Sequence, residues 1–261
     1  MNNLILINAD TDSLMVSKPD GSPWTKEEQS RFLESLNSQF PEKIRFEHDG
    51  VFKRVVVIKS KNYALLPEDS NKVKLKGSSI KDQKKEPALK EMMEKIVKAL
   101  IDDKKDIIIH IYHEYVKEAL NVIDIKRWAQ KKSLTESILK CKNWTQEQIH
   151  TKELRKNETD IWDSIKDEEG LQQGDKFYVY PVVEYKTITG RVSQKTGKPL
   201  KDMIEEINSL KLTKYWKNDH SPEKLIQRIY DTLCIFESVL DMSHYIDYSK
   251  TNNKKLLEKF K

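Results

Sequence analysis

Short apolar runs near the start of the chain are separated by polar residues in a pattern that predicts β-hairpins. Residues 4–7 (LILI) and 14–16 (LMV) are apolar, and the residues between them include the letters DTDS. Residues 51–66 (VFKRVVVIKSKNYALL) form a second pair of runs, rich in β-branched side chains, with polar residues at 59–62. Two strand-like runs joined by a few turn-forming residues indicate an antiparallel hairpin. We therefore expect two hairpins, followed by a short strand within residues 72–77 (KVKLKG).

Three further segments have the spacing of amphipathic helices. Thr25 stands three residues before Glu28 and is followed by an apolar face, which is the pattern of a capping box at the start of a helix. From Pro87 onward apolar residues recur at helical spacing, and this pattern continues through residue 120. A third helix is expected over residues 222–241, whose apolar residues also fall on one face.

These elements predict an α+β fold with two consecutive parts. Residues 1–87 combine the hairpins with one helix, whereas residues 88–261 are expected to be mostly helical. Within the second part, residues 172–185 (QQGDKFYVYPVVEY) indicate a turn and a strand. A chain of 261 residues is long enough for one large domain or two small ones.

Composition excludes several classes of protein. Charged residues make up 34% of the chain, and no apolar run approaches the roughly 18 residues that a membrane helix needs. The first apolar run lacks the preceding basic region of a signal peptide. The two cysteines, Cys141 and Cys234, form neither a disulfide framework nor a zinc-binding pattern. We therefore expect an intracellular protein without a membrane partner.

Basic residues are concentrated in one part of the chain. The formal net charge is +5, from 47 basic and 42 acidic side chains, which alone does not indicate a nucleic-acid partner. Residues 51–86 hold ten Lys or Arg against four acidic residues, a larger surplus than that of the whole chain. The segment is either a solvated lysine-rich surface or a surface that binds phosphates.

The aspartates Asp10 and Asp12 lie at the predicted turn of the first hairpin and allow several interpretations. Both could be turn residues whose carboxylates hydrogen-bond the local backbone. A calcium loop of the EF-hand type is excluded, because Ser13 stands where glycine is needed and Pro19 where glutamate is needed. A metal-dependent phosphatase of the haloacid dehalogenase type also places D-x-D after a strand, but it requires alternating strands and helices that the sequence does not indicate.

A two-metal phosphoryl-transfer site is another interpretation of the two aspartates. Two carboxylates 4 Å apart repel each other by about 4 kcal/mol at an effective dielectric constant near 20. A divalent cation relieves this repulsion, and Mg²⁺ favours carboxylate oxygens together with substrate phosphates. A hairpin turn would hold such carboxylates in a defined position, which phosphoryl transfer requires.

Several segments follow the order and spacing of one known family. DTDS between two apolar strands resembles the palm motif of family B DNA polymerases, usually written YGDTDS. KSKNYAL is similar to the K-x-Y element of that family, with Lys61 and Tyr63 in the matching positions, and KLKG then resembles its Lys-Gly strand end. WAQKKSLTESIL, GLQQGDKFYVYPV and HSPEKLIQRIYDTL resemble successive segments of the thumb. The resemblance covers nearly the whole chain.

The resemblance implies a role for each aspartate in Mg²⁺-dependent nucleotidyl transfer. In the family, the second aspartate of DTDS, here Asp12, binds the metal, and Asp10 participates less directly. The metal site would be a two-metal site that is completed by a partner chain. The substrates implied are primer–template DNA and deoxynucleoside triphosphates. Residues 1–87 would be the C-terminal part of the palm domain, and residues 88–261 the thumb domain.

The resemblance also implies a set of DNA contacts. The K-x-Y element lies along the primer strand, so Lys61 and Tyr63 would contact the primer, and Lys76 and Gly77 would belong to the same DNA-binding surface. A lysine at a phosphate positions the duplex without reading its sequence, as a polymerase requires. The lysine surplus of residues 51–86 is then part of a DNA surface.

The sequence departs from the family pattern in two ways. Asn8 and Ala9 replace the usual Tyr-Gly before DTDS. The upstream motifs D-x-x-S-L-Y-P and K-x-x-x-N-S-x-Y-G are not found in the sequence. We therefore expect a split polymerase of phage or viral type, inactive without an N-terminal polymerase polypeptide and located in the cytoplasm of an infected cell if viral. A non-catalytic DNA-binding remnant or accessory subunit is the first alternative, and a metal-dependent phosphatase of the haloacid dehalogenase type is the second.

The C-terminal letters NNKKLLEKF suggest one more partner. Leu256, Leu257 and Phe260 resemble the apolar anchors of the short peptide by which replicative members of the family bind a sliding clamp. The alternative is a frayed helix end.

Overall fold

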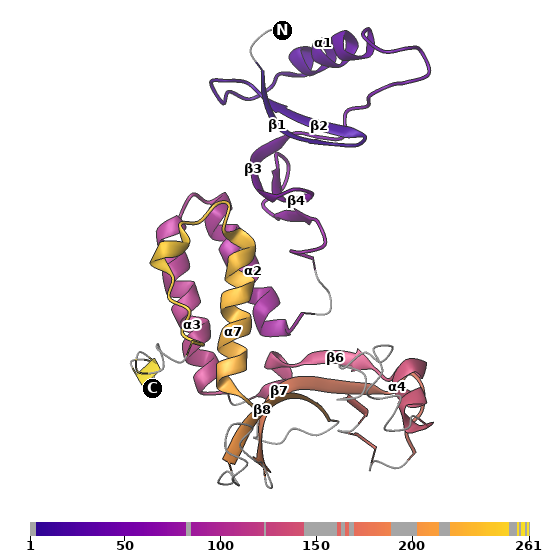
Figure 1. The fold of residues 1–261 in the computed structure, drawn as a ribbon. Coiled ribbons are helices and arrows are strands. Elements are labelled where there is room, and N and C mark those ends of the chain that lie inside the picture. The colour runs from indigo at the N-terminus through magenta and orange to yellow at the C-terminus, as the bar shows by residue number, and fades with distance from the viewer. Residues whose placement is uncertain are drawn as a thin grey trace, which may run out of the picture. The chain divides into compact units, whose positions relative to one another are not determined.

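The computed structural model describes residues 4–81, 85–122, 124–143, 161–162, 165–166, 170–188, 203–213, 220–250, 255, 257–258 and 260. Within these residues the fold is mixed α and β, and every sheet is antiparallel (Figure 1). The α+β class is therefore confirmed. None of the helices in this part of the chain is both long and apolar enough to cross a membrane.

The chain divides into two compact units that are not consecutive halves of the sequence. The first unit consists of Met1–Asp82, Glu94–Ile108 and Ile235–Met242. The second consists of Gln83–Met93, Ile109–Cys234 and Ser243–Lys261. This division does not test the expected palm–thumb boundary at residue 87, which stays a prediction.

The first unit begins with the expected hairpin. Strands β1 (Ile5–Asp10) and β2 (Ser13–Ser17) pair antiparallel, and the pairing ends with Asp10 opposite Ser13. The register shifts between Leu6 and Asn8, which is the signature of a bulge at Ile7. Two residues, Thr11 and Asp12, are left to form the turn.

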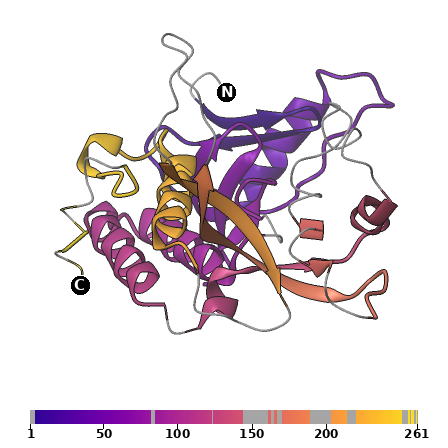
Figure 2. The same ribbon diagram turned by 60° about the horizontal axis from the view of Figure 1, so that its bottom comes forward.

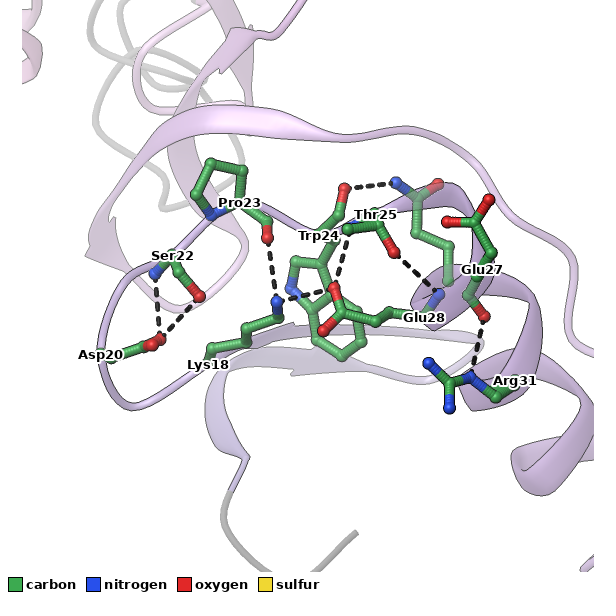
Figure 3. Close-up of polar contacts among 10 residues, drawn as sticks. Lys18, Asp20, Ser22, Pro23, Trp24, Thr25, Glu27, Glu28 and Arg31 are labelled. Atoms are coloured by element: carbon green, nitrogen blue, oxygen red, sulfur yellow. Dashed lines mark hydrogen bonds and ion pairs between the residues drawn. The ribbon is translucent and has the colours of Figure 1, made fainter.

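Helix α1 (Lys26–Asn37) follows this hairpin and starts as the sequence indicates. The Thr25 side chain accepts a hydrogen bond from the Glu28 backbone, and the Glu28 carboxylate accepts one from the Thr25 backbone at 2.8 Å (Figure 3). Lys18 Nζ contacts the same carboxylate at 2.6 Å and donates to the Pro23 carbonyl at 2.9 Å. The predicted capping box is confirmed, and an ion pair ties it to the end of β2.

The second hairpin and the short strand form one sheet of order β3-β4-β5. The strands are β3 (Phe52–Lys59), β4 (Asn62–Pro67) and β5 (Lys74–Lys76). Lys59 pairs with Asn62, so Ser60 and Lys61 form the two-residue turn between β3 and β4. The predicted hairpin and strand are confirmed.

Later segments of the sequence pack on this sheet within the first unit. The Arg54 guanidinium donates to the Ile101 carbonyl at 2.6 Å, and the Ser238 hydroxyl donates to the Ile58 carbonyl. Ile58 is fully buried. These contacts anchor the hairpin that carries Lys61.

The helix expected to run from Pro87 through residue 120 is interrupted. Helix α2 (Pro87–Ile101) and helix α3 (Ile108–Leu120) are separated by a turn and the short 3-10 helix η1 (Lys105–Ile107). Asp103 has a φ of 57°, which is the left-handed conformation that commonly ends a helix. The apolar spacing does not reveal this break, because the same period resumes after the turn.

Besides its helices, the second unit contains a three-stranded sheet of order β6-β7-β8, of which the sequence indicated only the strand within residues 172–185. Figure 2 shows strands β7 and β8 as long neighbouring ribbons. The apolar residues of β8 are separated irregularly by polar ones, so its sequence has no clear period, and pairing with β7 defines the strand. The elements of this region are η2 (Ile125–Trp128), β6 (Gln130–Ser133), α4 (Glu136–Lys140), η3 (Cys141–Asn143), β7 (Lys176–Ile188) and β8 (Met203–Thr213).

The core beneath β6 and β7 explains why this sheet forms. Phe177 and Val179 of β7 are each 1% exposed and pack with the buried residues Leu134, Ile138, Ile161 and Ile165. The β-branched and aromatic residues in the first half of β7 favour an extended strand. The turn and strand predicted at 172–185 are therefore confirmed.

Helices α3 and α7 (Pro222–Leu233) pack through aromatic side chains in the second unit. The Tyr112 and Tyr230 rings lie 6.5 Å apart, and Tyr112 donates a hydrogen bond to the Ile246 carbonyl at 2.7 Å. Helix α7 ends at Leu233 rather than at residue 241, and the 3-10 helices η4 (Cys234–Phe236) and η5 (Met242–His244) follow.

Two of the described residues of the C-terminal tail are packed against the second unit. Leu257 is buried, and the Phe260 ring lies 5.3 Å from the ring of His113 and 5.1 Å from that of Tyr248. Leu256, the third apolar residue of the expected clamp-binding peptide, lies outside the described residues. Binding of a clamp through this peptide stays a prediction, and it would require these contacts to be released.

Candidate functional site

The turn of the β1–β2 hairpin presents two carboxylates in different environments. Asp10 is the last residue of β1, and its Oδ1 accepts hydrogen bonds from the Thr11 backbone N–H at 2.8 Å and the Thr11 hydroxyl at 3.3 Å. Asp12 is an exposed residue of the turn. Within the part of the chain that the structure describes, its side chain makes no hydrogen bond or ion pair. Asp12 is therefore the carboxylate that is available to an external ligand.

The donor set at this turn is suited to a metal ion but is incomplete. An exposed, unpaired carboxylate is the ligand type that Mg²⁺ prefers, because Mg²⁺ binds through one or two carboxylates together with substrate phosphates and water. No group of three or more His, Cys, Asp or Glu side chains able to hold a metal ion occurs among the described residues. The hairpin could thus supply part of a metal site, and the remaining ligands would come from elsewhere.

Lys61 joins the two hairpins at their tips. Its Nζ lies 3.4 Å from Asp10 Oδ1, while the Lys61 side chain is 70% exposed. The Thr11 backbone hydrogen bond, and after it the charge of Lys61, hold the pKa of Asp10 below its ordinary value. Asp10 therefore stays ionised and is partly neutralised by a side chain that remains open to solvent.

Tyr63 and Lys76 are brought together by the register of β4 and β5. The two residues are direct partners in the antiparallel ladder, so their side chains share one face of the sheet. Tyr63 is half-buried, whereas Lys76 is exposed. The structure thus collects Lys61, Tyr63 and Lys76 around one end of β4.

Gly77 follows β5 and packs against the Lys61 turn. Its φ is 109°, a conformation that side-chain-bearing residues rarely adopt. A Cβ at this position would lie 2.3 Å from the Lys61 carbonyl oxygen and 2.4 Å from Asn62 Oδ1. Glycine is therefore needed at this position of the predicted Lys-Gly pair, because any side chain would prevent the chain from passing this close to the turn.

Asn62 is a site residue that the sequence analysis missed. It is 5% exposed, its Nδ2 donates to the Ser60 carbonyl at 2.9 Å, and its Oδ1 accepts from the Ser79 backbone N–H at 2.9 Å. An asparagine beside a hairpin turn is common in any sequence. In the sequence, only the later Lys-Gly segment is connected with Asn62, because the Asn62 amide packs beside Gly77 in the folded chain.

The basic surplus of residues 51–86 is largely solvent-exposed where the structure describes it. An exposed cationic surface attracts the phosphates of a nucleic acid with little dependence on its base sequence. Asp82 and Lys84 of this segment lie outside the described residues. The exposed lysines are Lys53, Lys59, Lys61, Lys72, Lys74, Lys76 and Lys81.

Comparison with known proteins gives the family of this chain. The family model described as DNA polymerase family B matches residues 2–217 of the 261. DNA polymerase 1 of Pyrococcus abyssi is 28% identical over 115 residues, which is 44% of this chain and 14% of that protein. The aligned stretch is thus a small part of the relative's length. Because the family model covers well over half of the chain, this chain belongs to DNA polymerase family B.

Proposed function

We propose that this chain provides a metal-binding hairpin and part of the primer–template surface of a DNA-directed DNA polymerase. The observation that carries the proposal is the contact between Lys61 and Asp10, which joins the DTDS hairpin to the K-x-Y hairpin. A polymerase needs a metal-binding carboxylate and a grip on the primer close to each other, because positioning supplies much of the catalysis of phosphoryl transfer.

Asp12, assisted by Asp10, would hold Mg²⁺ in this proposal. The exposed Asp12 carboxylate offers an oxygen ligand, and the two-residue turn limits how far that ligand can move. Asp10 holds the turn through Thr11 and Lys61 rather than presenting a free carboxylate. When bound, Mg²⁺ would supply charge stabilisation for the primer hydroxyl and the nucleotide triphosphate.

Lys61, Tyr63, Lys76 and Gly77 would contact the primer–template duplex. Lys61 and Lys76 are exposed cations at one end of β4, where they can bind backbone phosphates. Gly77 would take part through its backbone, which packs closely against the turn that carries Lys61. Such contacts grip every sequence equally, as template-directed synthesis requires.

The proposed polymerase needs parts beyond the described residues of this chain. The residues described hold no complete metal-binding group, so at least one further carboxylate and the nucleotide-binding residues would come from another part of the polymerase. We propose that an N-terminal polymerase polypeptide supplies them and that this chain is inactive without it. Residues 1–87 would then be the C-terminal part of the palm and residues 88–261 the thumb, acting in the cytoplasm of an infected host if the protein is viral.

A phosphatase of the haloacid dehalogenase type is disfavoured by the pairing of the strands. That class places its aspartates after a strand of a parallel sheet built from alternating strands and helices. Here the DTDS aspartates lie at the turn of an antiparallel pair, β1 and β2.

Primer extension with Mg²⁺ and all four deoxynucleotides tests the proposal. The chain is assayed alone, with the polypeptide that carries the upstream motifs, and in that mixture without Mg²⁺. Synthesis only in the complete mixture is the expected result. Duplex binding without synthesis, in a mixture shown to form a complex, would favour a DNA-binding remnant, and hydrolysis of phosphate esters by the chain alone would favour a phosphatase.

A further inference from the structure

We propose that Asn62 is a positioning residue whose buried amide fixes the Ser60–Lys61 turn, so that the Lys61 ammonium stays beside Asp10. The proposal deepens the polymerase function, because it rests on that function for the use made of Lys61. It assigns a role to the middle residue of the K-N-Y segment, between Lys61 and Tyr63.

The amide of Asn62 bridges two separate stretches of backbone. On one side Nδ2 donates to the Ser60 carbonyl at 2.9 Å, inside the β3–β4 turn. On the other side Oδ1 accepts from the Ser79 N–H at 2.9 Å, beyond the end of β5. Asn62 is only 5% exposed, so losing either partner would leave a buried polar group unsatisfied. The amide therefore ties the turn to the segment that follows Gly77.

The turn needs this constraint because Lys61 has an unfavourable backbone conformation. Its φ is 60°, in the left-handed region that lysine seldom occupies. A conformation of this kind persists where the surrounding structure over-determines it. Gly77 supplies the second constraint, because its backbone packs directly against the Lys61 carbonyl and the Asn62 amide.

The fixed turn sets the point and direction from which the Lys61 side chain extends. With its backbone held, the side chain reaches Asp10 Oδ1 at 3.4 Å and remains 70% exposed. Asp12, two residues further along, has no partner among the described residues. The arrangement places a cation at the hairpin tip for a DNA phosphate and leaves the Asp12 carboxylate open. A pre-positioned lysine also loses less conformational freedom when it binds a phosphate.

A zero-length cross-link tests the position of Lys61 without DNA or activity. A water-soluble carbodiimide couples an amine to a carboxylate that is already in contact, and mass spectrometry of the digested chain measures the Lys61–Asp10 product. The Lys18–Glu28 pair, 2.6 Å apart, provides an internal control in the same unit. The variant is Asn62→Ala, with Asn62→Ser as a second, milder change, and the matched control is Asn71→Ala at an exposed position.

The expected result is a several-fold loss of the Lys61–Asp10 cross-link in both Asn62 variants, with the Lys18–Glu28 cross-link kept. Asn71→Ala should leave both cross-links unchanged. A Lys61–Asp10 yield in folded Asn62→Ala equal to that of the unaltered chain would overturn the proposal. Loss of both cross-links in Asn62→Ala and in Asn62→Ser would also overturn it, because Asn62 would then be needed for the whole unit.

Binding of a primer–template duplex separates this inference from the proposed function. If Asn62 acts through Lys61, both single variants weaken binding, and the double variant Asn62→Ala with Lys61→Ala binds no more weakly than Lys61→Ala. If the losses of affinity in the two single variants add up in the double variant, Asn62 does not act through Lys61. If Lys61→Ala binds duplex normally while Asn62→Ala has lost the cross-link, the DNA role of Lys61 fails and the positioning role of Asn62 stands.

Discussion

The Lys61 ammonium and the Asp10 carboxylate lie 3.4 Å apart, which joins the tips of two hairpins that are distant in sequence. The contact leaves the neighbouring Asp12 without a partner among the described residues. Two adjacent carboxylates of one motif thus have different surroundings, one paired and one open. This difference matches a division of work in which Asp10 holds the turn and Asp12 binds the metal ion.

Lys76→Ala should weaken binding of primer–template DNA by a similar factor for every duplex sequence. Lys76 is exposed beside Tyr63, and a lysine that contacts a phosphate adds affinity without reading bases. The slope of log affinity against log salt concentration should fall by about one. Fluorescence anisotropy with two unrelated duplexes measures both quantities. Lys26→Ala, at an exposed position of α1, serves as the control and should change neither.

Gly77→Ala should destabilise the first unit far more than a glycine replacement in open space. The added Cβ meets the Lys61 carbonyl and the Asn62 amide, and the backbone is at positive φ, so we expect a loss of about 3 kcal/mol in the free energy of unfolding. Gly21→Ala is the matched control, because Gly21 also has positive φ but nothing lies within 4 Å. It should cost only about 1 kcal/mol. Equal losses in urea unfolding would show that the packing at Gly77 is unimportant.

Sequence patterns predicted the local elements of the first unit well. The hairpin around Asp12, the hairpin around Lys61 and the capping box at Thr25 each depend on a few neighbouring residues, and each is confirmed. The motif order also indicated the family, which the family model confirms over residues 2–217.

Features that depend on distant parts of the chain could not be predicted from the sequence. The contact between Lys61 and Asp10 depends on how two hairpins pack, and no local pattern encodes it. The buried Asn62 amide accepts a hydrogen bond from Ser79, which lies on another segment. Strand β8 is defined by its pairing with β7, so its own residues gave too weak a signal. The metal-binding and DNA-binding roles of the site residues remain predictions.

Lys18→Ala should raise the pKa of the Glu28 carboxyl toward its ordinary value of 4.5. Lys18 is the largest cause of the lowered pKa, and the Thr25 backbone hydrogen bond is the next, so part of the lowering should remain. NMR titration of the Glu28 carboxyl carbon measures the change. Lys26→Ala should leave the titration unaltered.

The same carboxyl gives the first unit a defined pH dependence. Because the folded pKa of Glu28 is lowered, the unfolded chain binds more protons between the two values. The stabilisation that the ionised Glu28 carboxylate contributes is therefore complete above about pH 4.5 and is lost as pH falls through the folded pKa. In Lys18→Ala, the first unit should lose less stability through Glu28 as the pH falls. If the free energy of unfolding depends on acid pH as in the unaltered chain, Lys18 is not the cause of the lowered pKa.

Arg127→Ala should destabilise the second unit. The Arg127 guanidinium contacts Glu118 at 2.5 Å and Glu91 at 2.6 Å, and these carboxylates raise its pKa. Its removal would take away the cation that both carboxylates contact. Since all three side chains are partly exposed, we expect a loss of about 1 to 2 kcal/mol in the free energy of unfolding.

Lys140→Ala is the matched control for Arg127→Ala. Lys140 pairs with Glu136 on the surface, where both side chains are about two-thirds exposed. Such a pair contributes less than about 0.5 kcal/mol. Thermal unfolding of the two variants should therefore differ clearly, and equal midpoints would contradict a structural role for the Arg127 network.

The most direct measurement of the central claim is primer extension by the reconstituted polymerase with Asp12→Asn, next to Asp10→Asn and the exposed control Asp49→Asn. If Asp12 holds Mg²⁺, Asp12→Asn should lower kcat by about 1,000-fold, equivalent to about 4 kcal/mol of lost transition-state stabilisation. Asp10→Asn should cause a smaller loss, and Asp49→Asn none. Synthesis by Asp12→Asn at the rate of Asp49→Asn would contradict the account.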